Sequence, residues 1–168
     1  MVNGERLIVR TIRPNDTAAL IRMHERLSTD SIYRRYFGAR PVLSGKDAHR
    51  FTHLLEVGRG ALVAETAAGE LVAVSRYEGS ATSDAAEIAA IVQDTYQGHG
   101  LGRTMLAGLV ELARSAGLKY LVADVLEENR PMLGLLRSLG LQVVSTVRDA
   151  SVITITLALD PATGARSG

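Results

Sequence analysis

The chain of 168 residues contains no cysteine. This absence excludes disulfide bonds, a thiol nucleophile and zinc sites built on cysteine ligands. No charge of one sign predominates either, because 19 Lys and Arg stand against 18 Asp and Glu, for a formal net charge of +1. Such a balance gives no reason to expect nucleic acid or an anionic membrane as a partner.

Long apolar runs are also missing. No stretch predicts a transmembrane helix, and no apolar segment with a cleavage site follows the first residues, so we expect no membrane association, no signal peptide and a cytoplasmic protein. With 46% hydrophobic residues, the composition is that of a globular protein with a core. The length suits one domain, which we predict over 1–159, followed by a disordered tail over 160–168.

Apolar periodicity predicts the element order β, α, α, α, β, β, β, α, β, α, β, β. The strands are expected at 5–12, 61–66, 71–77, 87–92, 120–125, 141–147 and 152–157. The helices are expected at 14–28, 29–37, 44–55, 103–116 and 130–138. The strand 120–125 is mostly apolar, which predicts burial on both of its faces. The order indicates a mixed sheet in an α+β or α/β domain.

The most informative stretch is the turn 97–102, with the sequence QGHGLG, between the strand 87–92 and the helix 103–116. Glycines let the backbone come close to a ligand, and the N–H groups of the first helical turn attract an anion. We interpret the turn as a phosphate cradle. A Rossmann turn is the main alternative, since Asp124 lies near the spacing of its acidic residue. Against it, the third Rossmann glycine is missing and antiparallel strands precede the turn. A structural turn without a ligand is a further alternative.

These residues resemble the GCN5-related N-acetyltransferase (GNAT) family over nearly the whole chain. The family has an R/Q-x-x-G-x-G/A pyrophosphate loop between its fourth strand and third helix, and Gln97, Gly100 and Gly102 occupy the defining positions. Asn129 matches a family Asn at the start of the next helix. Three segments look like bacterial protein-lysine acetyltransferase domains: LSTDSIYRRYFG (27–38), AEIAAIV (86–92) and VLEENRPML (125–133).

The resemblance implies an α+β (mixed α/β) GNAT fold, with helices flanking a central mixed, mostly antiparallel sheet of six to seven strands. It implies acetyl-CoA as the acyl-donor substrate, bound in a splay between the fourth and fifth strands. The pantetheine arm would run beside the fourth strand and contact the backbone groups of Ile91 and Val92. Asn129 would bind near the acyl end, although Asn129 also fits a helix N-cap. The predicted donor-binding residues are Ile91, Val92, Gln97, Gly98, His99, Gly100, Leu101, Gly102, Arg103, Thr104 and Asn129.

Glu87 is the predicted catalytic residue. An amine with a pKa of ~10.4 is mostly protonated at neutral pH, and a carboxylate in a semi-buried cleft can accept its proton as a general base. An exposed strand-end carboxylate is the alternative. Many family members carry a Tyr acid seven residues after the Asn, where this chain has Leu136. Tyr33 and Tyr36 are the nearest replacements in the predicted topology.

The chain is thus predicted to be an N-acetyltransferase whose acceptor amine attacks the thioester directly. The subfamily resemblance favours a protein lysine as acceptor. A small-molecule amine, such as an antibiotic or polyamine, and a non-catalytic acetyl-CoA sensor remain alternatives. No metal site is predicted, because His49 and His53 are four apart without a third ligand. The chain is expected to be a monomer or a homodimer.

Overall fold

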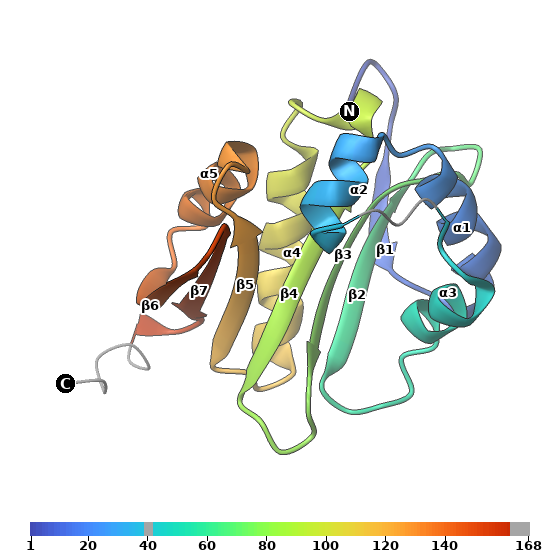
Figure 1. Ribbon diagram of the computed structural model, residues 1–168. Coiled ribbons are helices and arrows are strands. Elements are labelled where there is room, and N and C mark those ends of the chain that lie inside the picture. The colour runs from blue at the N-terminus through green and yellow to red at the C-terminus, as the bar shows by residue number, and fades with distance from the viewer. Residues whose placement is uncertain (39–41, 162–168) are drawn as a thin grey trace.

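The computed structural model describes residues 1–38 and 42–161. Within them, seven strands form one sheet in the order β1-β2-β3-β4-β5-β7-β6, flanked by helices (Figure 1). The strands are β1 (Ile8–Thr11), β2 (Arg59–Glu65), β3 (Leu71–Gly79), β4 (Ala85–Val92), β5 (Tyr120–Leu126), β6 (Gln142–Asp149) and β7 (Val152–Ala158). The helices are α1 (Thr17–Glu25), α2 (Thr29–Tyr36), α3 (Gly45–Thr52), α4 (Leu101–Ser115) and α5 (Arg130–Ser138), with 3₁₀ turns η1 (Pro14–Asp16) and η2 (Asp94–Tyr96).

The predicted element order and the mixed, mostly antiparallel α+β fold are confirmed. All neighbouring strands run antiparallel except β4 and β5, which are parallel. The helix α3 ends at Thr52 rather than near 55, and Leu55 is 90% exposed, so no burial favours a longer helix. The predicted tail 160–168 lies outside the described residues from 162 onward.

Two main cores lie on the two faces of the sheet. One packs α1 and α3 against β2 and β3, and its most buried members are Met23, Ala48, Val63 and Leu71. The other packs α4 and α5 against β4, β5 and β7, and its most buried members are Leu106, Leu109, Leu121, Val125 and Leu157. The sheet is therefore a middle layer between α1–α3 on one side and α4–α5 on the other.

Helix α4 follows the predicted amphipathic pattern. Its buried residues recur at helical spacing: Leu101, Met105, Leu106, Leu109, Val110 and Ala113. It begins at Leu101, two residues earlier than predicted, because Gly100 takes a left-handed conformation and serves as its N-cap. Even this longest helix is too short and too polar to cross a bilayer, and the same holds for every other helix in the described part of the chain.

The junction of β4 and β5 is the feature that positions the site. Only three pairs join these strands, from Ala85–Tyr120 to Glu87–Val122. Beyond Glu87, β4 continues to Val92 beside β3, while β5 continues beside β7. The two strands therefore diverge toward their C-terminal ends, and the predicted splay between the fourth and fifth strands is present.

The prediction that β5 is buried on both faces is wrong. Leu121, Ala123 and Val125 are fully buried toward α4 and α5, whereas Asp124 is exposed and Val122 is half-buried. On this second face, Asp124 borders the open side of the splay. Apolar composition alone does not separate a face that awaits a ligand from a face that is covered by a helix.

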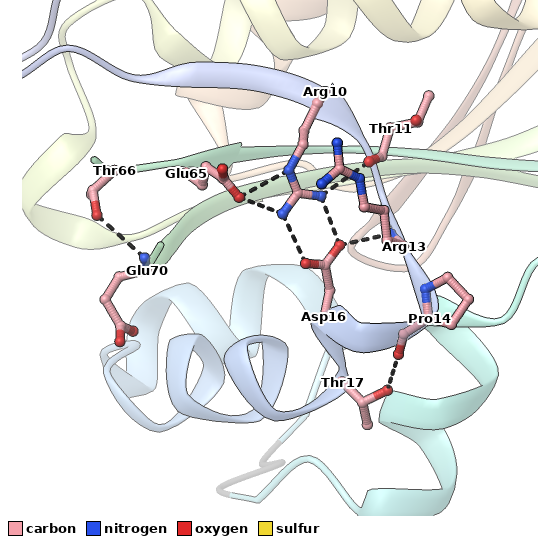
Figure 2. A network of polar contacts seen from close by, with 9 residues as sticks. All are labelled: Arg10, Thr11, Arg13, Pro14, Asp16, Thr17, Glu65, Thr66 and Glu70. Carbon is pink, nitrogen blue, oxygen red and sulfur yellow. Dashed lines mark hydrogen bonds and ion pairs between the residues drawn. The ribbon is translucent and has the colours of Figure 1, made fainter. Parts of the chain in front are cut away.

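A polar hub fixes the segment between β1 and α1 (Figure 2). Arg10 donates to both carboxylate oxygens of Asp16 at 2.8 Å and, through Nε, to Glu65 at 2.9 Å. The backbone N–H of Arg13 donates to Asp16 at 2.7 Å. Burial alone would raise the pKa of Asp16, but the hydrogen bonds from Arg10 and Arg13 outweigh burial and lower that pKa below its ordinary value.

Candidate functional site

A cleft of about 660 Å³ opens where β4 and β5 diverge. Residues of α2, β3, β4, the glycine-rich turn, β5 and α5 line it. Eight predicted site residues belong to this lining: Glu87, Ile91, Val92, Gln97, Gly98, Gly100, Gly102 and Asn129. The fold therefore gathers in one cleft the predicted base, the predicted cradle and the predicted binding asparagine, which are far apart in the sequence.

Two glycines shape the turn at one end of this cleft. Gly98 has φ of +77° and Gly100 has φ of +83°, conformations that side chains rarely adopt. A Cβ at either position would meet nothing within 4 Å. Since no protein atom occupies that space, the glycines leave the backbone open to an incoming group at the N-terminus of α4, where an anion is favoured.

Gly102 serves helix packing. It lies inside α4, and a Cβ there would meet a methyl carbon of Leu135 in α5 at 3.0 Å. This contact is tighter than ordinary van der Waals distance, so a side chain at 102 would require Leu135 to shift by a few tenths of an ångström. The glycine at the third position of the motif thus lies at the contact between α4 and α5, which both border the cleft.

Four predicted residues of the turn are outside the cleft lining. His99, Arg103 and Thr104 are exposed, and the Thr104 hydroxyl donates to the Gly100 carbonyl at 3.2 Å. The Leu101 side chain is buried in the core under α4, which leaves its backbone N–H as the group available to a ligand. For these residues the donor-binding role predicted from the sequence stays a prediction.

The Gln97 side chain holds the turn in place through two hydrogen bonds. Its side-chain amide donates to the Val92 carbonyl at 2.8 Å and to the Ser31 hydroxyl at 3.1 Å. These two bonds connect the turn to the end of β4 and to the first turn of α2. The structure therefore gives Gln97 a positioning role, in addition to its place in the cleft lining.

The register of β4 shows which backbone groups face the gap. The N–H of Gln93 donates to Val72, on the β3 side, whereas the carbonyl of Asp84 accepts from β5-side residues. Because neighbouring residues of a strand alternate, Ile88, Ala90 and Val92 direct their backbone groups toward the gap, and Ile91 directs its groups toward β3. The predicted backbone contact of Ile91 is corrected accordingly, and Ile91 lines the cleft through its side chain.

Glu87 lies in the cleft at the last of the three β4–β5 pairs. Its side chain is exposed, so the prediction of a semi-buried carboxylate is wrong for the protein without its ligands. Its partner across the β3–β4 ladder is Glu78, whose charge is matched by ion pairs with Arg50 and Arg76. The Glu87 side chain itself is exposed and lines the cleft.

Asn129 caps helix α5. Its side-chain oxygen accepts from the Met132 N–H at 3.2 Å, which confirms the N-cap prediction. The cap uses the oxygen, so the amide nitrogen is oriented by it and can donate to another group. The N-cap and the predicted binding role are therefore compatible.

The position of the usual family Tyr is closed to acid catalysis. Leu136 is 3% exposed and packs in the core between α5 and the sheet. Of the two predicted substitutes, Tyr36 lines the cleft and Tyr33 does not, its side chain being 42% exposed to solvent. Tyr36 is thus the tyrosine that the fold brings to the site.

Sequence reasoning missed a set of cations in the cleft. Arg34 and Arg35 come from α2 and Arg76 from β3, and all three line it. Arg76 stands between Ser75 and Tyr77 in a strand, and the alternation of strand side chains was the available signal that it shares a face with Val74 and Glu78. The two histidines at helical spacing stack on each other, with ring centroids 3.6 Å apart. No group of three or more metal-ligating side chains occurs among the described residues.

Comparison with known proteins places these features in context. A family model described as an acetyltransferase (GNAT) domain matches residues 6–142. The chain is 28% identical over 143 residues to the acetyltransferase Pat of Mycolicibacterium smegmatis, covering 82% of this chain and 41% of that protein. It is 36% identical over 88 residues to an L-methionine sulfoximine/L-methionine sulfone acetyltransferase of Pseudomonas aeruginosa, covering 49% of this chain and 50% of that protein. The chain thus spans about half or less of the length of these two relatives.

Solved structures share the fold. The GNAT domain of S. lividans PAT superposes with a TM-score of 0.81 at 33% identity, covering 89% of each chain. The acetyltransferase yncA of Salmonella typhimurium, described with its cofactor acetyl-CoA, superposes with a TM-score of 0.75 at 22% identity, covering 92% of this chain and 95% of that one. The second likeness concerns the fold alone.

Proposed function

Because this chain belongs to the GNAT acetyltransferase family, we propose that it transfers an acetyl group from acetyl-CoA to a primary amine. The observation that carries the proposal is the three-pair β4–β5 ladder, which opens into a cleft that ends at a left-handed glycine turn. An extended arm fits beside an unpaired strand edge, and a pyrophosphate fits at a helix N-terminus. The unpaired edge of β4 and the glycine turn at the N-terminus of α4 both belong to this cleft, and the turn follows the strand.

The donor's place follows from the backbone. The N–H and carbonyl groups of Ile88 and Ala90 face the gap, so they can pair with the amides of a pantetheine arm. The backbone around Gly98 and Gly100 receives the pyrophosphate, and the Asn129 amide nitrogen donates near the acyl end. Acetyl-CoA is thus held along the edge of β4 like an additional strand.

We assign the role of general base to Glu87. The carboxylate accepts a proton from the acceptor ammonium, directly or through water, and the neutral nitrogen attacks the thioester carbonyl. A C–N bond forms, and a β4 backbone N–H that faces the gap stabilises the oxyanion. The nitrogen then gives up its second proton to water as the C–S bond breaks. The thiolate takes a proton from Tyr36 or from water. No covalent enzyme intermediate is needed, consistent with a chain that lacks cysteine.

A protein lysine is the acceptor that we propose first. The 33% identity to the GNAT domain of S. lividans PAT, over 89% of both chains, supports this acceptor. A small amine is the second candidate, and the partial match to an L-methionine sulfoximine/L-methionine sulfone acetyltransferase supports it. Thiol release with lysine peptides and with small amines, at saturating acetyl-CoA, separates the two.

The test of the mechanism is Glu87→Gln, compared with Asp124→Asn. Both carboxylates line the cleft, and both changes keep the side-chain shape. We expect Glu87→Gln to lower kcat/KM by ~100- to 10,000-fold at neutral pH while the affinity for acetyl-CoA is unchanged. The deficit should shrink as pH approaches ~10.4, where a lysine amine loses its proton without help.

Other outcomes assign other roles. If kcat/KM of Glu87→Gln is within threefold of wild type and that of Asp124→Asn is strongly reduced, the general base is Asp124. A deficit that is constant with pH indicates positioning. If wild type binds acetyl-CoA but releases no thiol with any amine, the chain is a non-catalytic acetyl-CoA-binding module.

A further inference from the structure

Arginines gather in the cleft near Glu87. Arg76 on β3 is the cross-strand partner of Ala89, two residues after Glu87 on β4. Cross-strand partners and alternate residues of a strand share a face of the sheet, so Arg76 and Glu87 are diagonal neighbours, with Cα atoms ~7–8 Å apart. Both side chains line the cleft.

The guanidinium of Arg76 is held in a fixed place. Its side chain is 22% exposed, and its Cζ lies 3.9 Å from the centroid of the Phe51 ring, which covers the cation by a cation–π contact. Nη1 reaches a carboxylate oxygen of Glu78 at 3.4 Å. A planar guanidinium that is held in place and covered on one face is well suited to bidentate binding of a carboxylate.

Arginines outnumber carboxylates around Arg76, even with the neighbouring Glu87 counted. The single carboxylate of Glu78 is shared by Arg76, Arg50 and Arg59, the last with its Nε at 3.9 Å. Arg35 from α2 adds a further cation on the cleft side. Burial first, and the repulsion of Arg35 second, lower the pKa of Arg76 to about 10. An anion bound beside Arg76 would favour the charged guanidinium, and so would oppose the effects of burial and of Arg35 on its pKa. It would also add negative charge where three arginines share the carboxylate of Glu78.

We propose that Arg76, together with Arg35, forms a subsite for an anionic group of the acceptor. This inference rests on the proposed transfer to an amine. A carboxylate at Arg76 lies within a few bonds of an amine at Glu87, given the diagonal spacing of the two side chains. An α-amino acid carries such a carboxylate, and so does a lysine peptide with an acidic neighbour. A polyamine carries only further cations and fits poorly.

The test uses matched acceptors that differ in one charge. L-Methionine sulfone is compared with its carboxamide, and a Lys-Asp peptide with the corresponding Lys-Asn peptide. Each is titrated into the protein saturated with CoA, which forms a dead-end complex without chemistry, and each is then assayed for acetyl transfer from acetyl-CoA. The proteins are wild type, Arg76→Gln and, as a control, Arg22→Gln. Arg22 lies on the surface of α1 and pairs with Glu70, outside the cleft lining.

Wild type and Arg22→Gln should bind the carboxylate form of at least one pair ~10- to 100-fold more tightly than its amide. Arg76→Gln should bind both forms equally, with the affinity for CoA unchanged. The pair that shows the preference identifies the source of the carboxylate. A binding preference without acetyl transfer would refute the proposed activity and keep the subsite. Equal binding of both forms by wild type, or a preference that survives in Arg76→Gln, would overturn the subsite.

Folding is controlled separately. Thermal unfolding of Arg76→Gln, followed by circular dichroism, shows whether the loss of the Glu78 contact unfolds the chain. If it does, Arg35→Gln provides the comparison, since Arg35 lies on α2 at the cleft and outside the β3–β4 ladder. Arg35→Gln should reduce the preference for the carboxylate form several-fold, and an undiminished preference would exclude Arg35 from the subsite.

Discussion

At the scale of single residues, the glycines of the turn before α4 differ in what they contribute. Gly100 provides a left-handed backbone with open space around it, and Gly102 provides close contact with Leu135. A substitution at 102 therefore acts through helix packing, whereas one at 100 acts through backbone strain and through the space that a ligand would occupy.

The role of Gly100 can be isolated with a matched glycine. Gly69, in the turn between β2 and β3, has φ of +81° and also has nothing within 4 Å of a built Cβ. Gly100→Val and Gly69→Val should each destabilise the fold by about 1–2 kcal/mol through strain. We expect CoA binding, measured by calorimetry, to be lost in Gly100→Val alone. Retained binding there would place the cradle elsewhere.

The Arg10 hub predicts a pH-dependent contribution to stability. Asp16 is 6% exposed, and its pKa is lowered from the ordinary value of 3.8. A lowered pKa stabilises the fold above pH ~3.8, and this contribution is lost as the pH falls through the lower folded value. Asp16→Asn should therefore cost about 1–3 kcal/mol of unfolding free energy at pH 7 and progressively less below pH 4.

Urea unfolding at several pH values measures this effect. Glu111→Gln, which removes an exposed i,i+3 pair with Arg114 on α4, is the control and should change stability by less than about 0.5 kcal/mol. A difference between wild type and Asp16→Asn that is constant with pH would show that the hub stabilises by shape and not by charge.

The sequence revealed the residues whose identity is demanded by the backbone or by a motif. Gly100 and Asn129 could be assigned because a turn and a helix start constrain them locally. The hub of Arg10, Asp16 and Glu65 could not, because its members are 6 to 55 positions apart and only the β1–β2 register brings them together. Arg76 was missed for the same reason, since its surroundings come from several separate elements, among them α2, α3 and β4.

At the scale of elements, Asp94 connects α2 to the end of β4. One of its oxygens accepts from the Ser28 hydroxyl at 2.5 Å and from the Ser31 hydroxyl at 2.9 Å, and the other accepts from the Ser28 N–H at 3.0 Å. Ser31 in turn accepts from Gln97. Helix α2, which carries cleft-lining arginines, is thereby joined to the turn that receives the donor.

Asp94→Ala should weaken binding of both substrates. The change removes three hydrogen bonds at the start of α2, so the KM values for acetyl-CoA and for the acceptor should rise several-fold while kcat changes little. Ser44→Ala, which removes the N-cap bond of α3 to the Asp47 N–H, is the matched control. It should leave the KM for acetyl-CoA unchanged. Equal effects of the two variants would mean that the loss of any cap loosens the cleft.

Element positions were predictable where an apolar pattern is repeated over several turns or pairs. The strong stripe of α4 allowed this, and α5 was placed at 130–138 as observed. The open face of β5 and the short α3 were predicted less well, because exposure at Asp124 and Leu55 depends on which neighbours are present. A local apolar pattern indicates which side chains tend to be buried, but the tertiary arrangement decides whether each of them is.

For the whole molecule, donor binding should raise thermal stability. A ligand that binds the native state and not the unfolded chain stabilises by about 2.7 kcal/mol at 100 times its Kd. For a chain of this size we expect the Tm to rise by about 5–10 °C. Thermal scans with increasing CoA check this expectation, with free adenine as a control that lacks the pyrophosphate. An unchanged Tm at millimolar CoA would contradict the assignment of the cleft.

The overall topology was accessible because the order of the elements leaves few ways to build the sheet. Short connections predict the antiparallel β2–β3–β4 meander, and the crossover through α4 predicts a parallel neighbour for β4. The splay between β4 and β5 was expected from the family resemblance alone, and the length of their pairing was not predicted. Nothing in the pattern of 85–92 or 120–126 states that pairing ends after Glu87 and Val122.

That short pairing has a consequence for the lifetime of the protein in a cell. Three residue pairs are the hydrogen-bonded link between the β1–β4 half of the sheet and the β5–β7–β6 half. Proteases act on transiently opened molecules, and a ligand that bridges the halves lowers the population of the open form. Degradation of this chain should therefore slow when acetyl-CoA is plentiful and quicken when it is scarce, so that the amount of enzyme follows the supply of its donor.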